Sequence, residues 1–196
     1  MRYRVIEQFL SGQECQQVIE LARPRFEPSM SWNVELGRNE RNDYRTSEQC
    51  YLKHGETPLI ADIENRIAAI THTPVQNGEA IQVARYGPGM YYKQHYDYFD
   101  VNFDSNTVQL NRGGQRIITS MCYLQSPIKG GSTYFPRLGS EKLGGHRFAP
   151  VQGRLLTWFN VDFDGNQDDS TLHVAEPVEE GEKIIFTRWI HQSAFF

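Results

Sequence analysis

The sequence predicts a mainly β fold, a double-stranded β-helix (jelly roll) supported by N-terminal helices. Two amphipathic helical segments lie within the first 78 residues, many short strand-like runs follow, and Gly-rich turn signals separate those runs. The chain has 196 residues, which is enough for one sizeable core. We therefore expect a single domain, with residues 1–78 as helical support and first strands and residues 79–196 as the jelly-roll core.

The two helices are marked by their N-terminal residues. Ser11 and Glu14 form a capping box, and apolar residues then recur at helical spacing. Thr57–Pro58 places an N-cap before a proline at the first helical position, and isoleucines recur on one face until Pro74. Because each helix has one apolar stripe, we expect both to pack against an outer face of the β structure.

From about residue 79 the apolar pattern changes to that of short strands. The runs predict strands at Ala80–Tyr86, Tyr92–Tyr98, Gln115–Leu124, Thr133–Phe135, Arg154–Phe159, Thr171–Ala175 and Lys183–Trp189. The intervening turns carry glycines, as at Gly113–Gly114 and Gly130–Gly131. The polar segment Val101–Asn111 lacks this pattern, and we expect a mobile loop there.

Composition excludes several functional classes. The formal net charge is −4 without a Lys/Arg block, so nucleic acid is not an expected partner. No apolar run is long enough for a membrane helix, and the N-terminus lacks the apolar stretch of a signal peptide. Cys15, Cys50 and Cys122 have neither zinc-ligand spacing nor an even count. We interpret them as packing residues and expect a cytoplasmic protein.

A candidate metal site begins with His95 and Asp97. Side chains at positions i and i+2 of a strand point to the same face, so an imidazole and a carboxylate would project together. His173 lies in another predicted strand and would complete two histidines and one carboxylate, the facial triad of non-haem Fe(II) oxygenases. His-x-Asp alone is a weak signal, since a solvated strand face gives the same pattern. His54, His72 and His146 lie in polar, turn-like segments and are expected at the surface.

Lys183 is the second unusual residue. Strand periodicity places it on one face with Ile185, Thr187, Trp189 and His191. A buried ammonium without a partner is costly, so an inward Lys183 needs an anion. The alternative is a lysine that reaches solvent or pairs with a surface glutamate. Next to a triad-like pattern, the distal carboxylate of 2-oxoglutarate becomes the favoured partner.

Several ordered blocks between Tyr44 and His191 carry a family resemblance. They are Tyr44–Ser47 (Tyr-Arg-Thr-Ser), Gln82–Tyr98 with its His-Tyr-Asp core, Gly113–Leu124, Gly130–Pro136 and Leu172–His191. In order and spacing they resemble the prolyl 4-hydroxylase branch of the 2-oxoglutarate- and Fe(II)-dependent dioxygenases. The loop after Asp97 departs from that family in sequence and length, which leaves the substrate open. With no preceding peptide-binding domain and no secretory signal, we do not expect a collagen-type substrate in a secretory lumen.

The resemblance implies a role for each matching residue. His95, Asp97 and His173 match the iron ligands, Lys183 matches the residue that binds the distal carboxylate of 2-oxoglutarate, and Tyr86 and Thr133 match further cosubstrate contacts. Tyr92, Arg116, Trp189 and His191 match positions that line the peptide groove. Core packing remains an alternative for Tyr92 and Trp189, and a surface ion pair for Arg116.

The resemblance implies hydroxylation of an unactivated C–H bond, at C4 of a peptidyl proline, with release of succinate and CO2. The expected cofactors are Fe(II), 2-oxoglutarate and O2, with ascorbate as reductant, and the expected partner is a proline-containing peptide or protein. Three alternatives stay open: the same chemistry on a free amino acid or small molecule, a zinc hydrolase with the same ligands, and a non-catalytic jelly-roll binding module.

Overall fold

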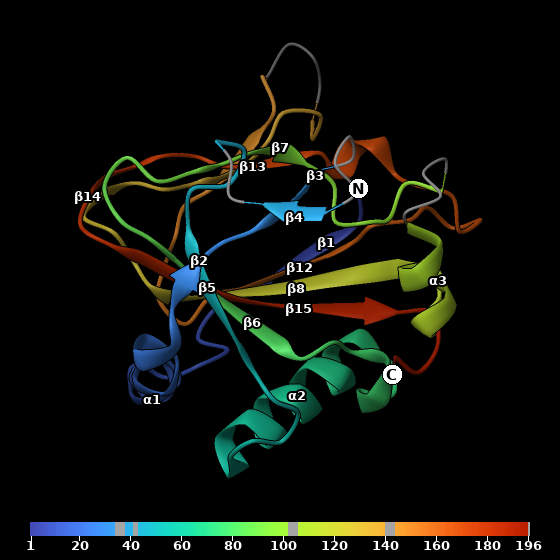
Figure 1. Cartoon of the computed structure of the whole chain (residues 1–196), viewed down its shortest axis with the longest axis horizontal. Coiled ribbons are helices and arrows are strands. Elements are labelled where there is room, and N and C mark those ends of the chain that lie inside the picture. Colours follow the sequence, from blue (N-terminus) through green and yellow to red (C-terminus); the bar gives the residue numbers. More distant parts are fainter. Residues whose placement is uncertain (34–37, 41–42, 102–105, 140–143, 196) are drawn as a thin grey trace.

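The computed structural model describes residues 1–33, 38–40, 43–101, 106–139 and 144–195 (Figure 1). Two antiparallel sheets dominate it. The larger one has the order β1 (Tyr3–Ile6), β12 (Leu155–Phe159), β8 (Arg116–Gln125), β15 (Lys183–His191), β6 (Ile81–Tyr86), β5 (Glu48–Leu52) and β2 (Glu27–Pro28). The smaller one has the order β11 (His146–Phe148), β10 (Thr133–Phe135), β13 (His173–Ala175) and β7 (Tyr92–His95). The short pairs β14–β9 (Val178–Glu180, Lys129–Gly130) and β3–β4 (Ser31–Asn33, Arg38–Glu40) complete the strands.

Both predicted helices are present and cover the outer face of the larger sheet (Figure 1). Helix α1 (Gly12–Ala22) starts with the predicted capping box. Helix α2 (Pro58–Thr71) starts at Thr57, whose hydroxyl accepts from the backbone N–H of Ile60. Their apolar faces join one buried cluster with the outward residues of the sheet. Both helices therefore support the larger sheet from one side.

Strand β15 separates the two hydrophobic cores. Its residues Ile184, Phe186 and Ile190 pack under the helices, while Ile185 faces the smaller sheet together with Trp158 of β12. The alternation is the period of two that the sequence predicts for this strand. Lys183, Thr187 and Trp189 consequently face the space between the sheets, where they line a cavity.

Four sequence-based boundaries are wrong or incomplete. The strand expected at Tyr92–Tyr98 ends at His95, because its pairing with β13 stops there and the chain bends. The strand expected at Thr171–Ala175 starts at His173, after a 3-10 turn. Part of the expected loop Val101–Asn111 is helical, since α3 spans Thr107–Gly113, and residues 102–105 lie outside the described residues. The first strands expected within residues 1–78 were given no bounds, and the structure places β1 at one edge of the larger sheet and β5 between β6 and β2.

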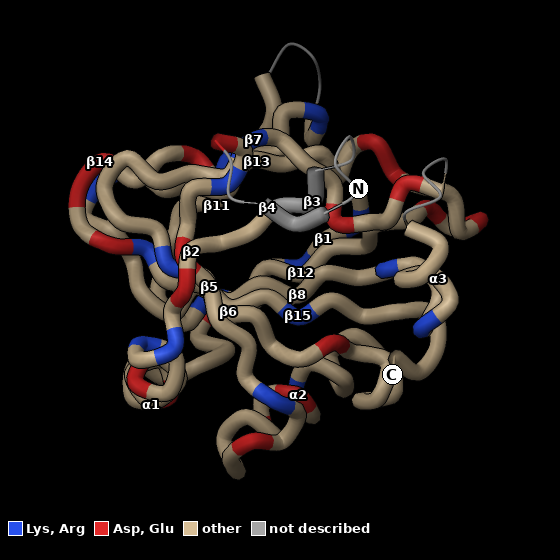
Figure 2. Tube along the Cα trace, viewed as in Figure 1, with Lys and Arg blue, Asp and Glu red and all other residues tan. Residues whose placement is uncertain are grey.

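Positively and negatively charged residues are scattered along the described trace (Figure 2). None of the described helices combines the length and apolar character needed to cross a bilayer. Cys15, Cys50 and Cys122 are buried and free, as expected of packing residues. The cytoplasmic setting stays a prediction.

Candidate metal centre and active site

The three predicted metal ligands come together between the sheets. His95 at the end of β7 and His173 at the start of β13 are directly paired in register. Asp97 lies just beyond β7, and one ligand atom from each residue lies within 4.8 Å of the others. The His95 Nε2 atom is 3.9 Å from Asp97 Oδ1, and the His173 Nε2 atom is 3.8 Å from Asp97 Oδ2. The chain bend after β7, rather than strand periodicity, directs the carboxylate toward the two rings.

Hydrogen bonds to the backbone orient both imidazoles. The Nδ1 atom of His95 lies 2.7 Å from the carbonyl oxygen of Lys93, and that of His173 lies 2.9 Å from the carbonyl oxygen of Thr171. A carbonyl only accepts, so Nδ1 carries the proton and the lone pair is on Nε2. Both lone pairs therefore face the Asp97 carboxylate, as a set of metal ligands requires.

The electrostatics favour the metal-binding forms of His95 and Asp97. Burial, with a further contribution from His173, lowers the pKa of His95 to about 3. Burial alone would raise the pKa of Asp97, but the surrounding groups outweigh it and hold that pKa below its ordinary value; these are the two histidines when protonated, Arg116, and the hydrogen bond from Thr119. Neutral imidazoles and an ionised carboxylate are the states that bind a metal. The donor set fits a divalent iron ion.

Two buried polar residues hold the carboxylate in place. The Thr119 hydroxyl donates to Asp97 Oδ2 over 2.8 Å, and the Asn160 side-chain amide donates to Thr119 Oγ1 over 2.9 Å. Thr119 and Asn160 are both fully buried. Neither was predicted as a site residue, although Thr119 lies in a block that carries the family resemblance.

Lys183 lies deep in the same cavity, with 1% of its surface exposed. Its ammonium donates to the Gly131 carbonyl oxygen over 2.9 Å and lies 4.5 Å from the centre of the Tyr86 ring. Burial lowers the pKa of Lys183 to about 7, with only a distant counteracting effect from Glu176. An ammonium nitrogen has three protons to donate, so this one retains capacity for an anionic ligand. The expectation of an inward lysine is confirmed.

The residues expected near the cosubstrate line this cavity. Tyr86 and Thr133 lie in its wall with Lys183 and the triad, so the structure brings them together as expected. The Thr133 hydroxyl accepts from the Tyr123 hydroxyl over 2.8 Å, which fixes its position. The specific contacts of Tyr86 and Thr133 with 2-oxoglutarate stay predictions.

The residues expected in the peptide groove form the outer part of the site. The Tyr92 ring is stacked on His95 with centroids 3.6 Å apart, and Trp189 lines the metal cavity. The Arg116 guanidinium lies 4.1 Å from the centre of the Trp189 ring. Its Nη2 donates to Glu79 Oε2 over 3.0 Å, and His191 Nε2 lies 2.8 Å from Glu79 Oε1. Arg116 is thus in a partly buried ion pair with Glu79, and its role in the peptide groove stays a prediction.

Glu79 and Arg45 are site residues that the sequence did not single out. Arg116 and His191 counteract the effect of burial on Glu79 and lower its pKa to about 2. Arg45 lines the metal cavity and donates to Ser47 and Gln82. Both residues lie in or next to the resemblance blocks, which was the one signal that could have found them.

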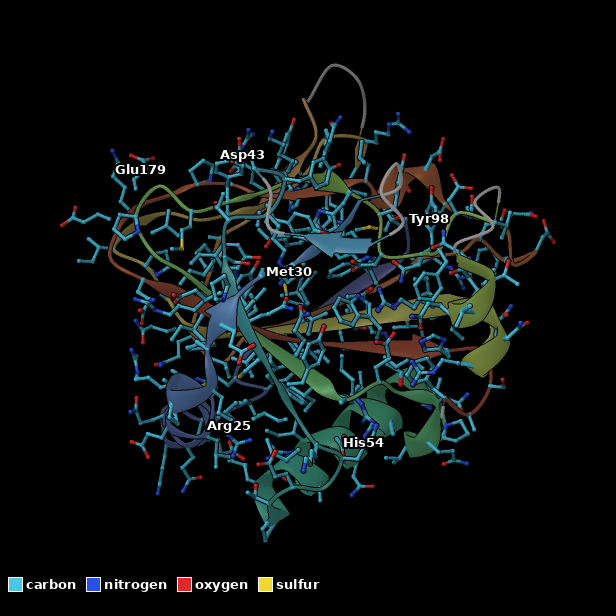
Figure 3. The ribbon with its side chains drawn as sticks, in the orientation of Figure 1. Arg25, Met30, Asp43, His54, Tyr98 and Glu179 are labelled. Carbon is cyan, nitrogen blue, oxygen red and sulfur yellow. The ribbon has the colours of Figure 1, made fainter. Side chains whose placement is uncertain are left out.

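The remaining histidines lie away from the site. His54, His72 and His146 are exposed, as predicted. His54 lies beside α2 and pairs with Glu64, far from Tyr98 near the metal-binding segment (Figure 3).

Comparisons with known proteins agree with this geometry. Residues 81–191 match the family model described as the 2OG-Fe(II) oxygenase superfamily. The chain belongs to the 2OG-Fe(II) oxygenase superfamily. Among its relatives are prolyl 4-hydroxylase 1 of Arabidopsis thaliana, 38% identical over 98% of this chain and 70% of that protein. Probable prolyl 4-hydroxylase 6 of the same plant is 37% identical over 95% of this chain and 68% of its own length.

Solved structures extend the similarity to the fold. The viral collagen prolyl hydroxylase of Paramecium Bursaria Chlorella virus-1, solved as its 2OG complex, matches with a TM-score of 0.73 and 30% identity over 97% of this chain and 96% of that one. A Pseudomonas putida prolyl-4-hydroxylase, 18% identical, shares the fold with a TM-score of 0.66 over 97% of this chain and 92% of that one. This chain is therefore a 2-oxoglutarate-dependent dioxygenase of the prolyl 4-hydroxylase branch, and it has the jelly-roll fold. The comparisons support this chemistry over the zinc-hydrolase and binding-module alternatives.

Proposed function

We propose that this enzyme hydroxylates a proline residue within a peptide or protein, at C4 of the ring. The observation that carries the proposal is the joint placement of the His95, Asp97 and His173 ligand atoms within 4.8 Å of one another. Lys183 lines the same cavity and supplies the cation that a dicarboxylic acid needs. Relatives named prolyl 4-hydroxylases support the proline target.

His95, Asp97 and His173 would hold Fe(II), and Lys183 would hold the distal carboxylate of 2-oxoglutarate. When bound, the metal and cosubstrate use O2 to convert 2-oxoglutarate to succinate and CO2 and transfer one oxygen atom to the substrate C–H bond. The core between the sheets supplies the apolar part of the cavity wall, through Met121, Trp158 and Ile185, and would limit the access of water to the reacting atoms. We propose ascorbate as the reductant that returns iron to the ferrous state after unproductive turnover.

The outer residues would position the peptide. Tyr92 and Trp189 line the cavity beside the metal ligands and would form the aromatic wall against which a proline ring packs. Arg116 would donate to a peptide carbonyl, since Glu79 holds its guanidinium in one orientation.

Analysis of the peptide product tests the proposed proline hydroxylation. A proline-rich peptide incubated with the enzyme, Fe(II), 2-oxoglutarate, ascorbate and O2 should become heavier by one oxygen, and NMR of the peptide should place the hydroxyl on C4 of proline. Turnover of 2-oxoglutarate that no proline peptide stimulates, but that a free amino acid does, would reject the peptide target.

A further inference from the structure

A second hollow lies beside the metal centre, on the far side of Arg116. Its volume is about 650 Å³. Its described walls include Tyr51 of β5, Phe99 after β7, Val108 and Arg112 of α3, and Phe195 near the C-terminus. Tyr51 and Val108 are 50% and 67% exposed, so the hollow opens to solvent and a peptide can enter it.

Arg116 lines the second hollow and contacts a residue that lines the metal cavity. Its guanidinium lies 4.1 Å from the centre of the Trp189 ring, which lines the metal cavity. On the other side it lies 4.7 Å from the centre of the Phe99 ring, which lines the second hollow. Its Nη1 is 3.5 Å from the backbone oxygen of Asp97. The second hollow therefore lies close to the metal cavity, and a peptide with its reacting residue at the metal would have neighbouring residues near this hollow.

The lining chemistry favours an aromatic guest. Tyr51, Phe99 and Phe195 present three rings, and the Arg112 guanidinium lies 4.2 Å from the centre of the Phe195 ring. Aromatic rings gain from stacked or edge-on contacts with other rings, and guanidinium groups gain from ring faces. An aliphatic guest would lose those contacts.

A cationic side chain fits the hollow less well. The Glu79 carboxylate, which also lines the hollow, is engaged by Arg116 and His191. A cationic side chain would therefore meet the guanidinium groups of Arg112 and Arg116.

We propose that the second hollow is a specificity pocket for an aromatic side chain of the substrate peptide, close in sequence to the proline that is hydroxylated. This inference rests on the proposed function. Because Phe195 and the α3 residues form one side of it, the C-terminal segment and α3 would select the sequence around the target proline.

Peptide binding tests the proposal without relying on turnover. Peptides of equal length with one proline would carry either glycine or tyrosine at each of the flanking positions. Their dissociation constants would be measured by calorimetry under anaerobic conditions, with Fe(II) and 2-oxoglutarate present. At one flanking position tyrosine should bind roughly ten-fold more tightly than glycine.

Variants of residues that line the second hollow test whether the preference for tyrosine peptides arises there. Phe195→Ala and Tyr51→Ala should reduce the tyrosine advantage to about two-fold or less. Phe163→Ala is the matched control, because Phe163 is 86% exposed and lies outside both hollows, so this variant should keep the advantage.

Three outcomes would overturn the proposal. Glycine peptides that stimulate succinate release, with tyrosine giving no gain in affinity at any position, would reject the pocket and leave the proposed function intact. An equal loss of preference in Phe163→Ala would reject the assigned location. Failure of every proline peptide to bind or to stimulate succinate release would reject the proposed function together with the pocket.

Discussion

Replacing Lys183 by methionine should separate cosubstrate affinity from fold stability. The ammonium is 1% exposed and donates to Gly131, so methionine can occupy the same space without a buried charge. A hydrogen bond to a charged group contributes about 1.5–3 kcal/mol, which corresponds to a roughly 10- to 150-fold increase in the KM for 2-oxoglutarate. The kcat at saturating 2-oxoglutarate should change much less.

The same substitution should stabilise the protein when 2-oxoglutarate is absent. Burial lowers the pKa of Lys183 from 10.5 to about 7, so between these values the unfolded chain binds more protons and wild-type stability rises with pH. Below about pH 7 the full cost of charging the buried amine is present, at most about 5 kcal/mol. The Lys183→Met variant lacks this cost, and its stability advantage should be largest at low pH.

Two assays check these expectations. Succinate release measured against 2-oxoglutarate concentration gives the KM, and urea unfolding at about pH 6 and about pH 9 gives the stability difference. Lys129→Met is the matched control, because Lys129 is an exposed lysine paired with Glu179 at the surface. An unchanged KM in Lys183→Met, or an equal increase in the control, would refute the assigned role of Lys183.

Three further predictions concern the surroundings of the metal. Thr119→Val removes the hydrogen bond to Asp97, so iron affinity should fall about 10- to 100-fold in an anaerobic Fe(II) titration, and unchanged affinity would count against its supporting role. Glu79→Ala leaves the partly buried Arg116 charge without its partner, so the free energy of unfolding should fall by about 1–3 kcal/mol in urea, and a loss under about 0.5 kcal/mol would contradict this. Since Arg116 helps lower the Glu79 pKa from 4.5 to about 2, the stability from this ionisation is present above pH 4.5 and lost as pH falls toward 2. The acid dependence of unfolding should therefore be shallower in Glu79→Ala over that window.

The sequence predicts the parts of the fold that have a clear periodic pattern. The capping box at Ser11 and the N-cap at Thr57 locate both supporting helices, and alternation in β15 places Lys183 and Trp189 between the sheets. Helix α3 is short, has no side-chain N-cap bond, and ends against the C-terminal segment, where Ser193 donates to Gly113. Its stability depends on tertiary contacts, which local sequence does not reveal.

In the candidate site too, the sequence predicts what a local pattern indicates and misses what depends on long-range contacts. The spacing of His95 and Asp97 predicted their convergence, but the reason given was incomplete, because Asp97 lies past the end of β7. Glu79 was missed because its role depends on Arg116 and His191, which are 37 and 112 residues away. Long-range ion pairs of this kind leave no periodic signal in one sequence.

The central claim is tested most directly by succinate release from 2-oxoglutarate by the purified protein with Fe(II) and ascorbate, with and without a proline-rich peptide. The wild type should release succinate faster when the peptide is present, and Asp97→Ala, which removes one of the three ligands, should release almost none. Wild-type protein that binds Fe(II) but releases no succinate, or an Asp97→Ala variant with near-normal turnover, would contradict the assignment of His95, Asp97 and His173 as the iron site.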